Sequence, residues 1–182
     1  MPVDSFSARI MDGNELASAL ARLAGELLKR YADCRKLAVV GIQRRGVFLA
    51  SRLKTLLDKE LGRNVPEGVL DINLYRDDWT TLGPRAVIGR SMLNFDVNDS
   101  ELVLVDDVLF TGRTIRAALE ALADFGRPRK VELLALVDRG HRELPIHADY
   151  IGKTIHTEHD ERVDVMLSEL DGRDEVLLIR RV

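Results

Sequence analysis

The sequence predicts an α/β protein: a central, mostly parallel sheet flanked by helices, with a small added β lobe. Apolar runs at 37–42 and 102–105 are typical of strands buried on both faces, as parallel sheets require, and 130–137 is predicted as a further strand. The segments between them repeat apolar residues with helical spacing, so strands and helices alternate. A hairpin turn predicted at Asp171-Gly172, before an apolar run at 176–179, indicates the added lobe.

Length and composition limit the possibilities further. We expect one domain over 1–182, with a flexible loop at about 76–98 and an added β hood at about 149–182. The net charge of −3 leaves no global basic field for nucleic acid, so any RNA site must be a local patch. Cys34 is the only cysteine, which excludes an intramolecular disulfide and a thiolate metal cluster.

The N-terminus carries no basic-then-apolar signal, and no apolar run approaches membrane-spanning length. We therefore expect a cytoplasmic protein without a membrane partner. A metal site built from histidines is disfavoured, because only His156 and His159 lie close together and no clear third ligand accompanies them. The other two histidines are His141 and His147.

The first part of the chain predicts a short strand at 6–11 and then a helix. Asp12 and Glu15 have the spacing of a capping box at the start of that helix. The apolar face that follows consists of Leu16, Leu20, Leu23, Leu27 and Tyr31. The opposite face carries Arg22, Lys29 and Arg30, for which a solvated helix face is the simplest interpretation.

A basic loop follows the strand predicted at 37–42. Two arginines, Arg44 and Arg45, lie between Gly41 and Gly46. The helix predicted after the loop has Val47, Ala50, Leu53, Leu56 and Leu57 inward. Open α/β sheets bind ligands at the carboxyl ends of their strands, so the loop is a candidate anion site. An arginine pair alone is weak support for an anion site. The motif at 102–114 strengthens this interpretation.

The main functional signal is Leu-Val-Leu-Val-Asp-Asp-Val-Leu-Phe-Thr-Gly-Arg-Thr at 102–114. A buried strand is predicted to end at Asp106 and Asp107. A turn then opens onto a helix with Ile115, Ala118, Leu119 and Leu122 inward. Such a turn presents backbone N–H groups and a helix N-terminus to a phosphate, and Gly112 permits close approach. The carboxylates suit sugar hydroxyls or a hydrated Mg²⁺.

Two other interpretations fit this motif less well. An ordinary strand–turn–helix with a solvated acidic corner would explain a lone Asp-Asp pair, but it explains the full register of 102–114 less well. A Walker B strand needs a partner Walker A loop. The glycine pair at Gly41 and Gly46 is followed by Val47-Phe48 where Lys-Ser/Thr is required, which excludes that interpretation.

The remaining segments are less regular. Residues 69–75 alternate like a strand, and 76–98 form a long connection of the kind that is often a lid. Its cations are Arg76, Arg85 and Arg90, and a surface loop with incidental arginines is an equally good interpretation for Arg85 and Arg90.

The motif at 102–114 resembles the phosphoribosyl pyrophosphate (PRPP) signature of type I phosphoribosyltransferases, whose fold the chain is then expected to share. The resemblance implies that the turn binds the 5′-phosphate of PRPP and that the acidic pair binds its ribose hydroxyls. It also implies Mg²⁺ carried by PRPP, with no metal ligand directly from the protein. Arg44, Arg45, Asp106 and Asp107 would be catalytic. The implied donor-binding residues are Arg44, Arg45, Arg85, Asp106, Asp107, Val108, Leu109, Phe110, Thr111, Gly112, Arg113 and Thr114.

Three further stretches, 71–78, 137–145 and 148–153, resemble the PyrR family. Its members are bifunctional: they attenuate pyrimidine operons by binding messenger RNA, and they are uracil phosphoribosyltransferases. The resemblance implies uracil as acceptor and UMP as product, with Arg139 and the backbone of Val163 lining the uracil pocket. No residue is identified as a general base for uracil.

The family resemblance also implies a partner RNA, the leader messenger RNA of pyrimidine genes, and a homodimer or higher oligomer. The implied RNA-binding residues are Arg22, Arg30, His141, Arg142 and Lys153. Ala21 and Gly25 stand where RNA-binding members commonly have Thr and His; His147 replaces a common Arg, and His156 a common Pro. Two alternatives stay open: a phosphoribosyltransferase for another base without an RNA role, and an RNA-binding regulator with vestigial activity.

Overall fold

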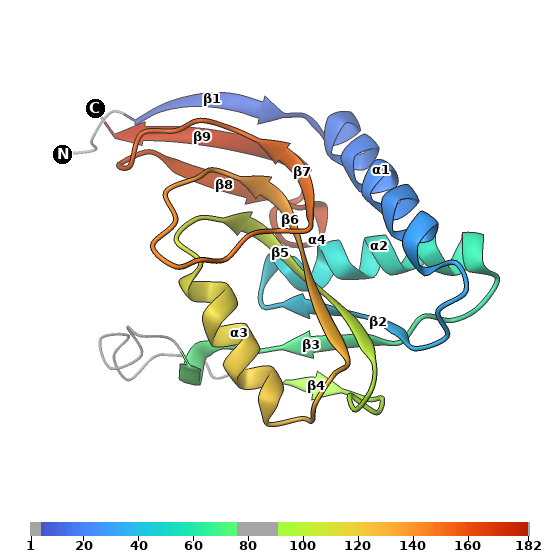
Figure 1. Cartoon of the computed structure of the whole chain (residues 1–182). Helices are drawn as coiled ribbons and strands as arrows, with labels where there is room; N and C mark the ends of the chain where they lie inside the picture. The colour runs from blue at the N-terminus through green and yellow to red at the C-terminus, as the bar shows by residue number, and fades with distance from the viewer. Residues whose placement is uncertain (1–4, 76–90, 182) are drawn as a thin grey trace.

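A computed structural model describes residues 5–75 and 91–181 of the chain (Figure 1). In chain order its elements are β1 (Ser5–Met11), α1 (Gly13–Tyr31), β2 (Leu37–Ile42), α2 (Arg45–Leu61), β3 (Glu67–Leu70), the 3-10 helix η1 (Asn73–Tyr75), β4 (Met92–Leu93), β5 (Glu101–Leu109), α3 (Arg113–Ala123), β6 (Lys130–Asp138), β7 (Tyr150–Thr154), β8 (Arg162–Met166), α4 (Ser168–Asp171) and β9 (Glu175–Arg181).

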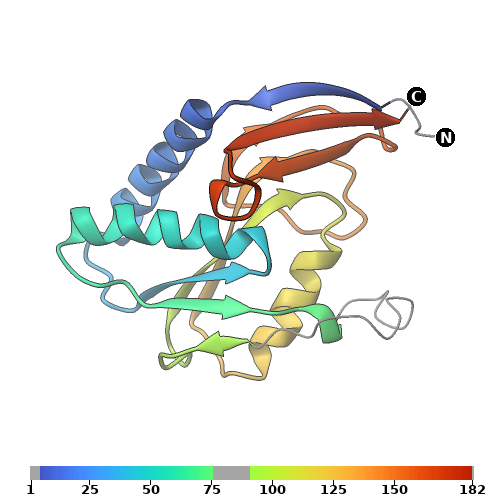
Figure 2. The ribbon, with the colours of Figure 1, turned by 180° about the vertical axis from the view of Figure 1, so that it is seen from behind.

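The central sheet has the strand order β4-β3-β2-β5-β6-β7. All its neighbouring pairs are parallel except β3 with β4. Helices α1 and α2 cover one face and α3 covers the other (Figures 1 and 2). Along β5 the core residues alternate between the two faces, Val103 and Val105 toward one and Leu102 and Leu104 toward the other. The predicted α/β class and mostly parallel sheet are confirmed.

A smaller antiparallel sheet, which we call the hood, has the order β1-β9-β8. It joins opposite ends of the described chain, because Ser5 pairs with Arg181 (Figure 1). The predicted hood boundary at about 149 is wrong in two ways: β7 pairs in parallel with β6 in the central sheet, and β1 belongs to the hood. The β8–β9 hairpin is present, but its connection contains α4 before the left-handed Gly172 at φ 73°.

Three other element predictions need correction. The strand that was expected to end at Asp106 and Asp107 continues past both aspartates to Leu109. The strand expected at 69–75 is the shorter β3 followed by η1. Leu119 is 43% exposed and lies outside the core, although its spacing fits the inward face of α3. Residues 76–90 of the expected flexible loop, with Arg76, Arg85 and Arg90, lie outside the described residues.

Helix α1 follows its sequence pattern closely. Asp12 accepts a hydrogen bond from the Glu15 backbone N–H at 2.9 Å, and the Glu15 carboxylate accepts from the Asp12 N–H at 2.8 Å, which completes the capping box. The predicted apolar face of α1 is buried throughout. No helix in the described ranges is both long and apolar enough to span a membrane.

Candidate functional site

Two helices start at the same edge of the central sheet. Strands β2 and β5 are parallel neighbours, so their carboxyl ends, and the starts of α2 and α3, lie together. Neither helix has a side-chain cap or an acidic residue in its first turn, in contrast to α1. Both helix dipoles therefore favour an anion at this edge, although in α3 the Arg113 N–H also donates to Thr111 Oγ1 at 3.3 Å.

Glycines bring the basic loop onto the backbone of β5. A Cβ atom on Gly46 would lie 2.3 Å from the carbonyl oxygen of Val105, and one on Gly41 would lie 2.4 Å from the Cα of Val47. No side chain fits at either position. The Gln43–Arg44 peptide bond between them is cis. Close backbone contact thus places the arginine loop beside Asp106, the residue after Val105.

The acidic pair is held by its own backbone. The Asp106 carboxylate accepts from the Asp107 N–H at 3.0 Å, and the Asp107 carboxylate accepts from the Val108 N–H at 2.9 Å. Burial raises the pKa of the Asp106 carboxyl, and the neighbouring charge of Asp107 raises it further. Burial also raises the pKa of Asp107, against the lowering effect of the Val108 N–H and the positive charge of Arg45. Both carboxyls therefore hold a proton more readily than exposed aspartates do.

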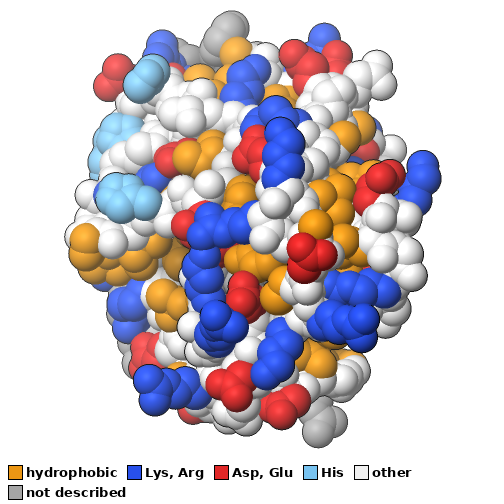
Figure 3. Space-filling model, turned by 45° about the vertical axis from the view of Figure 1, so that its right-hand side comes forward, with side chains coloured by type: hydrophobic (Ala, Val, Ile, Leu, Met, Phe, Trp, Pro, Cys, Tyr) orange, Lys and Arg blue, Asp and Glu red, His pale blue; other side chains and the backbone are white. Residues whose placement is uncertain are grey.

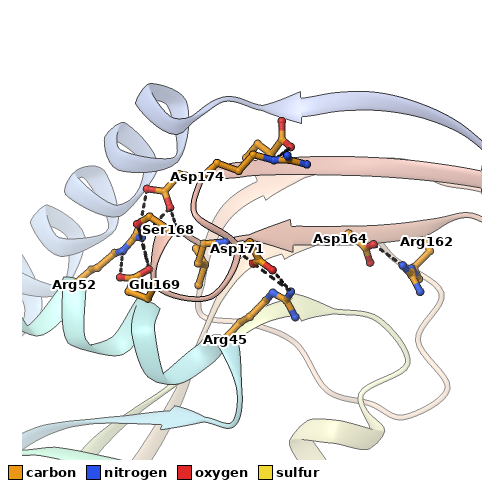
Figure 4. Close-up of polar contacts among 11 residues, drawn as sticks. Arg45, Arg52, Arg162, Asp164, Ser168, Glu169, Asp171 and Asp174 are labelled. Carbon is orange, nitrogen blue, oxygen red and sulfur yellow. Dashed lines mark hydrogen bonds and ion pairs between the residues drawn. The ribbon is translucent and has the colours of Figure 1, made fainter.

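Arg45 and Arg44, both candidates for pyrophosphate binding, differ in their surroundings. Arg44 is exposed at the start of α2. The Arg45 Nη2 atom lies 3.3 and 3.4 Å from the two carboxylate oxygens of Asp171 in the hood (Figure 4). Its Nε atom is buried and has no hydrogen-bond partner in the described part of the chain. Arg45 therefore retains unused donor capacity near the acidic pair.

The turn between β5 and α3 is fixed by the segment after β6. The Thr111 carbonyl accepts from the N–H groups of Glu143 at 3.0 Å and Leu144 at 3.2 Å, and Arg113 Nε donates to Glu143 at 2.6 Å. Gly112 has a φ of 91°, which favours glycine. Thr114 is partly exposed at the start of α3. These contacts with residues 143–144 fix the conformation of the turn.

Two residues expected in the donor turn lie instead in the strand. Val108 and Leu109 belong to β5, and the Leu109 side chain is buried in the core beneath α3. The Leu109 side chain therefore cannot reach a ligand, while Val108 is partly exposed.

A second cluster surrounds Arg139 at the end of β6. The Arg139 guanidinium lies 4.0 Å from the centroid of the Phe110 ring and donates to Thr157 Oγ1 at 3.2 Å. Burial lowers the pKa of Arg139, which is only 5% exposed. The rings of Phe110, His141 and His159 lie 5.4 to 5.9 Å apart. The structure thus joins Arg139 and Phe110, two predicted site residues.

Thr157 and His159 also belong to this cluster and were not predicted as site residues. The available signal was a polar segment that follows β7, a strand parallel to β6. Val163, the other expected pocket residue, is buried in β8 of the hood. Among the described residues, no group of three or more His, Cys, Asp or Glu could hold a metal ion.

The expected RNA-binding residues fall into two groups. On the α1 and β7 side, Arg22 donates to the carbonyls of Ile151 and Gly152 at 2.9 and 2.7 Å, and Lys153 donates to that of Ile10 at 2.7 Å. Arg30 pairs with the buried Glu132 at 2.7 Å. On the face drawn in Figure 3, Lys and Arg side chains are interspersed with Asp and Glu, and histidines gather at one side. Much of the positive charge is therefore locally paired.

The second group, His141 and Arg142, follows β6. His141 Nε2 lies 2.7 Å from the Thr157 carbonyl. The Arg142 guanidinium pairs with Asp138 and donates to the carbonyls of Phe110 at 2.8 Å, Gly140 at 3.2 Å and Ile146 at 3.0 Å. Its side chain is only 17% exposed. Arg142 thus ties the segment after β6 to the PRPP-motif turn, in addition to any contact with RNA.

This arrangement predicts a stability defect for Arg142→Ala. Truncation removes hydrogen bonds from a charged group and leaves Asp138 without its ion pair, so we expect a loss of about 2 kcal/mol or more. Thermal unfolding should show a Tm lowered by about 4–8 °C. His147→Ala, an exposed neighbour on the same segment, serves as control and should melt within about 1 °C of the parent. Equal Tm values for both variants would contradict the structural role of Arg142.

Comparisons with known proteins agree with this geometry. Residues 7–168 match the model of the phosphoribosyl transferase domain. The chain is 52% identical over 176 residues to the bifunctional protein PyrR of Syntrophobacter fumaroxidans, covering 97% of this chain and 95% of that protein. It is 49% identical to the bifunctional protein PyrR of Thermus thermophilus, covering 97% of each.

Solved structures resemble the fold at lower sequence identity. A hypoxanthine phosphoribosyltransferase from Staphylococcus aureus superposes with a TM-score of 0.69 at 21% identity, covering 93% of this chain and 90% of that chain. One from Trypanosoma cruzi gives a TM-score of 0.69 at 13% identity, covering 96% and 97%. These likenesses establish the type I phosphoribosyltransferase fold. Because the family model spans most of the chain and relatives share about half of its residues, the chain belongs to the PyrR family of phosphoribosyl transferase proteins.

Proposed function

We propose that this protein transfers the phosphoribosyl group of PRPP to uracil, giving UMP and pyrophosphate. The observation that carries the proposal is the meeting of two helix starts without N-cap side chains, the acidic pair with its buried Asp106, and Arg45 at one sheet edge. Membership of the PyrR family supports uracil as the acceptor and cytoplasmic action. The assignment of 1–182 to one domain remains part of the proposal.

The chemistry follows from the charges at this edge. Breaking the bond at ribose C1 develops positive charge on the sugar and negative charge on the leaving pyrophosphate. Arg44 and Arg45 would stabilise the leaving group, and the turn from Thr111 to Thr114 would hold the 5′-phosphate. Asp106 and Asp107 would bind the ribose hydroxyls and favour the cationic sugar. Because the reactants must be aligned, positioning supplies much of the rate enhancement.

Mg²⁺ is the cofactor that PRPP would bring. The carboxylates of Asp106 and Asp107 are hard oxygen donors of the kind that suits Mg²⁺ and its water ligands, so the residues present fit the ion. When bound, the ion neutralises charge on the pyrophosphate of the donor. The protein's own residues position the ribose and the 5′-phosphate, and Arg139 with Phe110 and the Val163 backbone would line the uracil site.

An acceptor panel tests this proposal. The purified protein is incubated with Mg²⁺, PRPP and, in separate reactions, labelled uracil, orotate, hypoxanthine, guanine or adenine. We expect UMP from uracil and far less product from the other bases. Product from a different base would replace uracil as the acceptor, and no nucleotide from any base would reject the enzymatic proposal.

RNA-dependent regulation is the second candidate function. The bifunctional relatives favour it, as does the position of Arg22 and Lys153 on neighbouring segments of α1 and β7. We propose that UMP in the active site strengthens binding to the leader messenger RNA of pyrimidine genes. Ala21 and Gly25 remove polar groups from that face, so the affinity should be weakened and its salt dependence shallower.

A gel-shift titration against the leader RNA, with and without UMP, tests the regulatory proposal. We expect tighter binding with UMP than without it. Identical affinity with and without UMP would reject the switch. Absence of binding at low salt would leave only the enzyme.

We also propose a homodimer or higher oligomer, by the same family resemblance. Sedimentation at micromolar concentration should show a species larger than the 20.5 kDa chain. A monomer throughout the concentration range would contradict this proposal.

A further inference from the structure

Two arginines of α2 reach the hood segment 167–174 in different ways (Figure 4). Arg52 is saturated: it donates to Glu169 at 2.6 and 2.8 Å, to Asp174 at 2.8 and 2.9 Å, and to Ser168 Oγ at 2.9 Å. The hydrogen bonds to Glu169 and Asp174 raise the pKa of Arg52 above its ordinary value. This cluster fixes α4 against α2.

Arg45, at the start of the same helix, makes an incomplete contact with the same segment. Its distances of 3.3 and 3.4 Å to the Asp171 oxygens exceed the roughly 2.7–2.9 Å typical of charge-assisted hydrogen bonds. Only Nη2 is engaged, and the buried Nε has no partner among the described residues. Because the Arg45 side chain is 31% exposed and its contacts with Asp171 are long, the guanidinium can also donate to a further anionic ligand.

Asp171, by contrast, is held firmly by the hood. Its carboxylate accepts from the Leu167 N–H at 2.9 Å, and its own N–H donates to the Leu167 carbonyl at 2.7 Å. The Asp171 side chain is 17% exposed. Arg45 also lies close enough to Asp107 for its charge to lower the pKa of that carboxyl. Arg45 therefore lies between a fixed hood carboxylate and the proposed donor site.

We propose that Asp171 is a positioning residue for donor binding, which acts through Arg45. It holds the Nη2 edge of the guanidinium from the hood, and the remaining N–H groups stay directed to the pyrophosphate oxygens of PRPP. Asp171 and the ligand then use different edges of one guanidinium. This inference rests on the proposed function, because it assigns Arg45 to the pyrophosphate of the donor.

Asp171→Asn tests the inference, because it removes the charge and keeps the shape. We expect the KM for PRPP and the Kd for pyrophosphate in the presence of Mg²⁺ to rise about fivefold or more. The KM for uracil should stay within about twofold, because the proposed uracil site lies at Arg139. In an Arg45→Gln background, Asp171→Asn should have no further effect on pyrophosphate affinity.

Glu169→Gln is the matched control, since it weakens the Arg52 cluster without touching Arg45. It should lower the Tm and leave the KM for PRPP unchanged. If Asp171→Asn fails to fold, Asp171→Glu keeps the charge and the acceptor but displaces the guanidinium, and should raise the same KM.

Three results would overturn the positioning role: unchanged pyrophosphate affinity in the folded Asp171 variant, tighter affinity, or equal increases in both KM values. If Arg45 does not bind the pyrophosphate at all, the result is different: Arg45→Gln alone would then leave pyrophosphate affinity unchanged.

Discussion

Asp107→Asn is expected to lower the turnover of uracil to UMP by about a hundredfold or more, with the fold intact. The substitution keeps the volume of the side chain and removes the charge proposed to stabilise the cationic sugar. Steady-state kinetics with saturating PRPP and uracil measure the effect. Asp33→Asn makes the same chemical change at an exposed position after α1 and should leave turnover unchanged. Normal turnover in the Asp107 variant would remove Asp107 from the site.

The same substitution should stabilise the protein at neutral pH. A carboxyl whose pKa is raised by folding binds its proton more tightly in the folded state, so its contribution to stability falls as pH rises through the folded pKa. Asp107→Asn abolishes this penalty. We expect its Tm to exceed that of the parent at pH 7, and the difference to shrink as the pH falls toward the ordinary carboxyl range. A lower Tm at pH 7 would contradict the cost of burying this charge.

Gly46→Ala should disrupt both stability and activity. Its Cβ would lie 2.3 Å from the Val105 carbonyl oxygen, so the arginine loop must move away from β5. Overpacking of this kind costs about 3 kcal/mol at the upper end of its usual range. We expect the Tm to fall by about 6–12 °C and uracil transfer to be lost, because Arg44 and Arg45 move with the loop.

Gly25→Ala provides the matched control. Gly25 lies within α1, and a Cβ there meets nothing within 4 Å. Alanine should therefore stabilise the helix by about 0.5–1 kcal/mol. An active Gly46→Ala protein that melts like the parent would contradict the close contact between the loop and β5.

The sequence predicts local elements well where one pattern decides them. The capping box at Asp12 and Glu15 and the buried strand 37–42 depend on residues close in the chain, and both form as expected. Sheet membership depends on distant partners. The β7 segment has no local feature that separates a central strand from a hood strand, and its pairing with β6 decides the matter. The exposure of Leu119 likewise depends on what α3 packs against.

The donor motif was recognisable because its groups are consecutive in sequence. Asp106 to Thr114 supply the acidic pair, the turn and the helix start within one stretch. Partners from distant segments were not recognisable: Asp171 reaches Arg45 from the hood, and Arg22 donates to carbonyls of β7. Charged side chains that look free in a sequence can thus be committed to contacts in the fold, as Arg142 is.

The most direct test of the proposed site is a crystal structure of the protein with UMP. We expect the 5′-phosphate on the N–H groups of the turn from Thr111 to Thr114, the ribose hydroxyls at Asp106 and Asp107, and the base beside Arg139. Electron density for UMP at another surface, with this edge empty, would contradict the assignment of the site.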